Sequence, residues 1–165
     1  NCRCVLQIQG ARIVDSPSHE RHYEFERYMK KHGVTVYSHE MDWNDFDYGQ
    51  YDVMADMLMD KYPDIDGIFA ADMVAIACIR QLLKRKKKVR IDVKVVAYDG
   101  TYVAKVGVMN LTVVQQPIEE LAKSAVNILL NMMQGKKYHN KKAFFEPSLL
   151  YGDTTYNKDK IEFEN

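Results

Sequence analysis

The chain has 165 residues, of which 47% are hydrophobic and 28% charged, enough for one hydrophobic core of ordinary size. Its 23 basic and 23 acidic residues cancel to a net charge of zero, so the overall balance favours neither nucleic acid nor an anionic membrane as a partner. Three cysteines form no disulfide framework, no apolar run could span a bilayer and no signal-peptide pattern opens the chain, so we expect a cytoplasmic protein.

Strands and helices alternate along the chain. Short apolar runs predict buried strands, and apolar residues three and four positions apart predict helices. Proline at the first turn and glycine after the last turn mark the clearest helix ends. In chain order the expected elements are a strand at 3–9, a helix at 17–33, a strand at 34–37, a helix at 47–62, a strand at 65–71, a helix from 72 into the basic run 84–88, strands at 93–98 and 111–114, a helix at 117–135 and an extended segment at 148–151.

Repeated strand–helix pairs with apolar strands predict an α/β fold, in which helices wrap a mostly parallel sheet. In such folds small molecules bind where the C-terminal ends of strands meet loops. The strand at 93–98 leads directly to Asp99, which makes this carboxylate the first candidate for a ligand contact. Asp72 follows the strand at 65–71 and stands where a helix N-cap is expected.

Sequence motifs of several enzyme classes are missing, namely G-x-S-x-G, the Walker loop, G-x-G-x-x-G and H-E-x-x-H. Cys78 lies on a predicted buried helix face, where a free thiol acts as a small hydrophobe rather than a nucleophile. Cys2 and Cys4 could join His19 and His22 in a zinc site only if the first helix docks suitably. We therefore predict a protein that is not an enzyme and holds no metal and no other cofactor.

Two more residues have the chemistry of a sugar contact. Trp43, the only tryptophan, lies in an acidic loop at 42–47. Its ring is either part of the core or a platform for the C–H face of a sugar, and the pattern alone favours neither reading. Arg21, in the first turns of the 17–33 helix, is exposed by default, yet beside a strand end its guanidinium could hold a ligand through two hydrogen bonds.

Three segments together carry a resemblance to a known family: DGIFAADMVA at 66–75, DVKVVAYDG at 92–100 and LTVVQQP at 111–117. In order and spacing they resemble the effector-binding core of the lactose-repressor/galactose-repressor family of bacterial transcription regulators, the sucrose-operon repressors among them. The likeness runs from about Val5 to Thr155. It implies a type I periplasmic-binding-protein-like fold, in which two α/β subdomains joined by three crossovers hold a small molecule between them.

The resemblance also implies how the chain is divided. Residues 1–155 correspond to the C-terminal part of an effector (sugar)-binding domain, with 1–115 and 143–155 in the C-terminal subdomain, 116–142 in the N-terminal subdomain and 156–165 as a tail. The N-terminal lobe is then largely absent, as is the helix-turn-helix module that binds operator DNA. The helix at 117–135 is expected to expose an apolar face.

Four residues match effector contacts of the family. Arg21 matches its effector-binding arginine, Trp43 the aromatic that stacks on the ligand, and Asp99 the carboxylate that accepts the ligand's protons. Gln116 matches the crossover position, which lines the cleft and acts as a hinge.

Other positions depart from the family pattern. Ala71 replaces an asparagine that sugar-binding members often carry, and Gly152 replaces an arginine before the last Thr pair. Lys86 and Arg90 replace the usual glycine and proline between a helix and a strand, which we expect to change the surface rather than the site.

These features favour the ligand-sensing domain of a transcription repressor that responds to a sugar or sugar phosphate, works as a homodimer and does not contact a membrane. A sugar-binding protein of a transport system shares the fold and is the alternative. A small α/β enzyme is the third reading, which the missing catalytic motifs disfavour.

Overall fold

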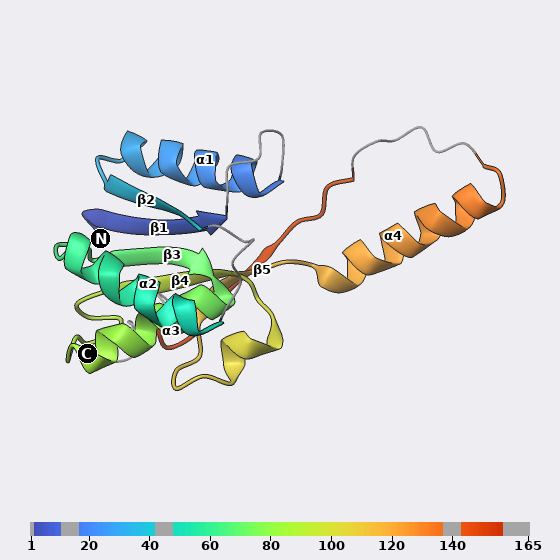
Figure 1. Cartoon of the computed structure of the whole chain (residues 1–165). Coiled ribbons are helices and arrows are strands. Elements are labelled where there is room, and N and C mark those ends of the chain that lie inside the picture. Colours follow the sequence, from blue (N-terminus) through green and yellow to red (C-terminus); the bar gives the residue numbers. More distant parts are fainter. Residues whose placement is uncertain (1, 11–16, 42–47, 137–142, 157–165) are drawn as a thin grey trace, which may run out of the picture.

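The computed structural model describes residues 2–10, 17–41, 48–136 and 143–156 (Figure 1). Within them a six-stranded sheet has the order β2-β1-β3-β4-β5-β6, and β1 to β5 are parallel. The predicted α/β class is therefore confirmed. The elements are β1 (Cys4–Gly10), α1 (Pro17–Lys31), β2 (Thr35–Met41), α2 (Tyr48–Lys61), β3 (Gly67–Ala71), α3 (Asp72–Lys84), β4 (Lys94–Asp99), the 3-10 helix η1 (Tyr102–Lys105), β5 (Thr112–Gln115), α4 (Ile118–Met133) and β6 (Ser148–Leu150).

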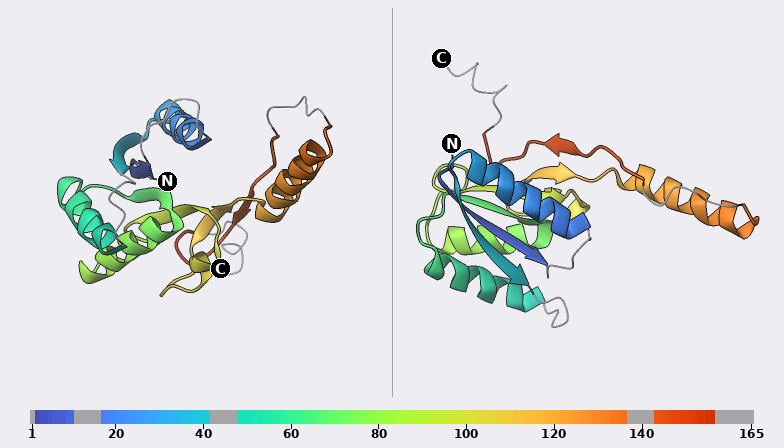
Figure 2. Two further views of the ribbon diagram at one scale, coloured as in Figure 1. Left: turned by 45° about the vertical axis from the view of Figure 1, so that its right-hand side comes forward. Right: turned by 90° about the horizontal axis from the view of Figure 1, so that it is seen from above.

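Helices cover both faces of the sheet. α1 packs over β1 and β2 on one face, whereas α2 and α3 lie together on the other (Figures 1 and 2). All seven residues of β1 are buried, including Gln7 and Gln9, because the strand is central and covered on both sides. The parallel order directs the C-terminal ends of β1, β3, β4 and β5 to one edge, where ligands bind in open α/β sheets.

The inward face of α1 carries a histidine. His22 is 3% exposed, whereas the larger aromatic residue Tyr28 of the same helix is 61% exposed. Phe25 stacks on Phe69 with ring centroids 4.3 Å apart, and His22 packs edge-on against Phe69 and Tyr98. Histidine is polar enough to be overlooked in a hydrophobic pattern, although its ring packs well against other aromatic rings.

The last described segment closes the sheet. β6 pairs with β5 in the antiparallel sense, which the sequence did not predict. Beyond it the hydroxyl of Thr154, which is fully buried, donates to the carbonyl of Val95 at 2.6 Å and accepts from the amide of Thr112 at 2.9 Å. The C-terminal segment is therefore part of the core of the sheet.

α4 extends away from the sheet (Figures 1 and 2). None of its residues, all of which the structure describes, is buried. The expectation of an exposed apolar face is confirmed by Ile118, Leu121, Val126, Leu129, Leu130, Met132 and Met133. Among the described residues no helix is long and apolar enough to cross a bilayer.

Candidate functional site

A polar cluster lies at the edge of the sheet where β4 and β5 end. Asp99 is the last residue of β4, and Gln116 directly follows β5. Arg21 reaches the same place from α1, on the face opposite α3. Three of the four predicted ligand contacts, Arg21, Asp99 and Gln116, are thus brought together, whereas Trp43 lies outside the described residues.

The Asp99 carboxylate is held in an unusual backbone conformation. Its φ of 95° lies in the left-handed region, which non-glycine residues avoid at a cost of about 1–3 kcal/mol. The Gln116 side-chain amide donates to Asp99 Oδ1, and the Gln116 backbone amide donates to the Asp99 carbonyl at 3.0 Å. Burial raises the pKa of Asp99, while the Arg21 charge and the Gln116 hydrogen bond oppose that shift. Strain at such a position is typical of functional sites.

Arg21 lies across an aromatic ring that the sequence did not single out. Its guanidinium carbon is 3.9 Å from the centroid of the Tyr98 ring, and this cation–π contact orients the planar guanidinium group. Arg21 Nε is buried without a hydrogen-bond partner among the described residues. A ligand oxygen at this place would satisfy that donor. Tyr98 precedes Asp99 in an apolar strand, and only its position next to the carboxylate could have indicated its role.

The role predicted for Asp72 is wrong. Ala71 is the N-cap of α3, and no side chain makes a capping hydrogen bond there. Instead the Asp72 carboxylate accepts hydrogen bonds from the Thr101 amide at 2.7 Å, the Thr101 hydroxyl at 2.8 Å and the Gly100 amide at 3.4 Å. The neighbouring turn after β4 offers three donors, and these compete successfully with the helix amides for the carboxylate.

Gly100 lets this turn pass close to β5. Its φ is 71°, and a Cβ at this position would lie 2.7 Å from the Gln115 side chain and 2.8 Å from its Cα. The side-chain amide of Gln115 donates to the Gly100 carbonyl at 3.2 Å. The residues that shape the site but were missed from the sequence are therefore Tyr98, Thr101 and Gln115, whose roles depend on strand neighbours far apart in the chain.

The other chemistry weighed from the sequence does not form a second site. Cys78 is fully buried, and burial raises the pKa of its thiol to about 12, which confirms it as a small hydrophobe. Among the described residues no three His, Cys, Asp or Glu side chains are placed to hold a metal ion.

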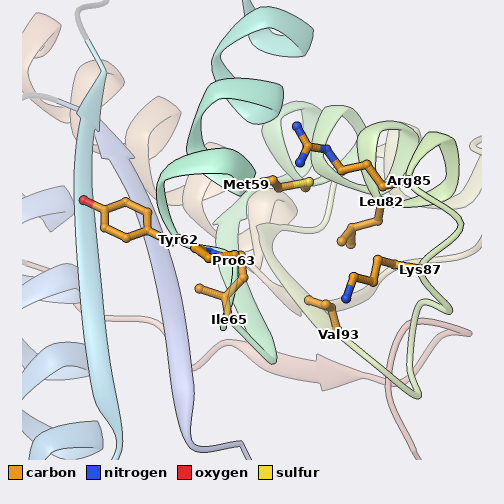
Figure 3. Close-up of a pocket in the computed structure, with 8 residues that line it drawn as sticks. All are labelled: Met59, Tyr62, Pro63, Ile65, Leu82, Arg85, Lys87 and Val93. Atoms are coloured by element: carbon orange, nitrogen blue, oxygen red, sulfur yellow. The ribbon is translucent and has the colours of Figure 1, made fainter.

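A pocket of about 190 Å³ lies at the opposite edge of the sheet (Figure 3). It is lined by Ile65 and Val93, which precede β3 and β4, and by residues at the ends of α2 and α3. Arg85 and Lys87 also line it, and Arg85 forms ion pairs with Asp56 and Asp60 at 2.7 and 2.6 Å, so the charge of Arg85 is already neutralised within the protein. The polar cluster around Asp99 remains the candidate site.

Comparisons with known proteins agree with the α/β fold. The sequence pattern of the periplasmic binding protein-like domain matches residues 5–155. The ribose operon repressor of Halalkalibacterium halodurans is 26% identical over 164 residues, which cover 98% of this chain and 48% of that protein. The chain therefore spans about half the length of this curated relative.

Two solved structures have the same fold. The transcriptional regulator CelR in complex with cellobiose is 25% identical with a TM-score of 0.79, over 93% of this chain and 47% of that one. The lac repressor dimer bound to operator and the anti-inducer ONPF is 19% identical with a TM-score of 0.78, over 94% of this chain and 54% of that one.

Proposed function

The chain belongs to the family of periplasmic-binding-protein-like domains, in the group carried by lactose-repressor/galactose-repressor transcription regulators, and on this premise we propose that it senses a sugar or sugar phosphate for a repressor. The observation that supports this most is the cluster of Arg21, Asp99 and Gln116 at the C-terminal edge of a parallel sheet. A carboxylate, an amide and an unpaired guanidinium donor suit the alternating donors and acceptors of sugar hydroxyls.

Regulation in this proposal is a shift between two conformations. Residues 1–115 and 143–155 form one lobe, and residues 116–142 belong to a second lobe that the rest of the protein completes. An effector that binds both lobes favours one closure state. Closure then changes the spacing of helix-turn-helix modules in a cytoplasmic homodimer, and thereby the affinity for operator DNA.

Calorimetric titration of the full-length protein with sugars and sugar phosphates tests the proposal. At least one should bind with a Kd in the micromolar range, the ordinary range for small-molecule sites. The fluorescence of Trp43 should change over the same titration if its ring stacks on the ligand. Failure of every sugar and sugar phosphate to bind would contradict the proposed function, and an unchanged Trp43 signal at saturation would place that ring outside the site.

As pH is lowered, effector affinity should begin to fall at a pH above the one at which an ordinary aspartate takes up a proton. The pKa of Asp99 is raised by burial, so as pH falls this carboxylate takes up a proton above the usual value of about 4. Protonation removes an acceptor for ligand hydroxyls. Effector affinity should therefore fall over the pH range in which Asp99 is protonated. Titrations between pH 7 and pH 4 should show the fall, and Asp99→Asn should remove this pH dependence. An affinity that is constant down to pH 4 in the unaltered protein would contradict it.

A further inference from the structure

The Asp72 carboxylate is buried, 3% exposed, and all the hydrogen bonds described for it go to the turn that follows Asp99. Two of these bonds hold the amide and the hydroxyl of Thr101 at 2.7 and 2.8 Å. As the first residue of α3, Asp72 also places its negative charge at the positive end of the helix dipole. A buried carboxylate with this many donors fixes the segment that supplies them.

The fixed segment includes two consecutive residues with positive φ, Asp99 at 95° and Gly100 at 71°. Glycine tolerates this conformation, whereas an aspartate stays in it only when the surroundings hold it there. β5 holds the turn from one side, through Gln115 and Gln116. From the α3 side the anchor is Asp72.

We propose that Asp72 is a positioning residue for effector binding, which holds the turn at Gly100 and Thr101 so that the Asp99 carboxylate stays in its strained, ligand-facing conformation. Asp72 acts through Asp99 and does not itself contact the effector. This role rests on the proposed function, because it gives Asp72 a part in the same sugar site. It also accounts for a carboxylate at the start of α3 that makes no capping hydrogen bond.

The test replaces Asp72 by asparagine in the full-length protein. Asparagine has nearly the same shape but is uncharged and has one acceptor oxygen. If that oxygen accepts from Thr101, the NH2 group, which can only donate, faces the Gly100 amide. Affinity for the sugars that bind the unaltered protein should fall about 10-fold or more, since hydrogen bonds to a charged group are lost. Thr101→Val, which removes the hydroxyl donor and keeps the amide, should cost about 3-fold, and Thr101→Ser should restore the affinity.

A second measurement needs no ligand. The Gln116 backbone amide donates to the Asp99 carbonyl. None of the hydrogen bonds described joins Asp72 to Gln116. If Asp99 relaxes in Asp72→Asn, the exchange of the Gln116 amide hydrogen should accelerate about 10-fold or more. A role confined to Thr101 would leave that rate unchanged.

Asp66 provides a matched control. Its carboxylate accepts from the backbone amides of Arg3 and Cys4 at 2.9 Å, at the opposite edge of the sheet. Asp66→Asn should lower stability without changing sugar affinity or Gln116 exchange. Asp72→Asn with unchanged affinity, or with unchanged Gln116 exchange, would overturn the positioning role even though sugar binding stands. If the unaltered protein binds no sugar, the proposed function fails, and Gln116 exchange still decides whether Asp72 holds Asp99.

Discussion

If the proposed function is right, replacing Asp99 by alanine should abolish the effector response of the full-length protein while operator binding is retained. In the proposed site this carboxylate is the charged acceptor, and charge-assisted hydrogen bonds contribute about 1.5–3 kcal/mol each. Loss of two such bonds to ligand hydroxyls corresponds to a fall in affinity of about 100-fold or more. Calorimetry measures the loss of binding, and release of operator DNA by the effector measures the loss of response.

Two further variants separate the chemistry from the backbone strain at this position. Asparagine tolerates positive φ better than alanine, so Asp99→Asn keeps the turn and removes only the charge. It should bind effector more weakly than the unaltered protein but fold as well. Asp64→Ala removes an exposed carboxylate at the opposite edge of the sheet and should respond normally. Normal induction in Asp99→Ala would remove Asp99 from the site.

Alanine at Gly152 should destabilise the protein by about 3 kcal/mol, because an added methyl group has no space there. A Cβ at this position would lie 2.4 Å from the carbonyl oxygen of Asn110 and 2.5 Å from that of Leu111, both backbone atoms that cannot rotate away. The Gly152 amide donates to Thr112 Oγ1 at 3.0 Å, so moving the segment would also break a hydrogen bond to β5. Urea denaturation followed by circular dichroism measures the loss.

Gly107 is the matched control for this substitution. Its φ is not positive, and a Cβ there would meet its nearest neighbour, the Met109 carbonyl oxygen, at 3.4 Å, which is ordinary contact. Gly107→Ala should therefore change the free energy of unfolding by less than about 1 kcal/mol. Equal stability of the two alanine variants would show that the segment at 152 can move without cost. The close approach of the Asn110 and Leu111 carbonyl oxygens gives a physical reason for a glycine at position 152.

Features that depend on local sequence could be predicted, and features that depend on distant neighbours could not. The apolar run before Asp99 predicted a buried strand with a carboxylate at its end, and the structure confirms both. Pro17 and Gly33 correctly marked the two ends of α1, because their effects on the backbone act within one turn. The role of Asp72 was missed, since the three donors that bind it lie more than 25 residues away in the turn after β4.

The same reasoning explains the other differences. β6 runs antiparallel to β5 because the chain returns after α4, and the short run at Ser148–Leu150 contains nothing that fixes its direction. His22 was missed because its burial depends on Phe69 and Tyr98, which two other strands supply. The ligand roles of Arg21, Trp43, Asp99 and Gln116 stay predictions, to which the structure adds the proximity of three of them.

The pairing of Gln115 with Ser148 makes β5 and β6 equivalent to a hairpin whose turn has been expanded into residues 116–147. Insertions of this kind are tolerated because the ends of the inserted piece are neighbours, so the host sheet keeps its strand order. The segments 116–117 and 143–147, which are not strands, join this insertion to the paired ends of β5 and β6. Since Gln116 in the first segment is hydrogen-bonded to Asp99, a molecule bound at Asp99 would act directly on the connection to α4.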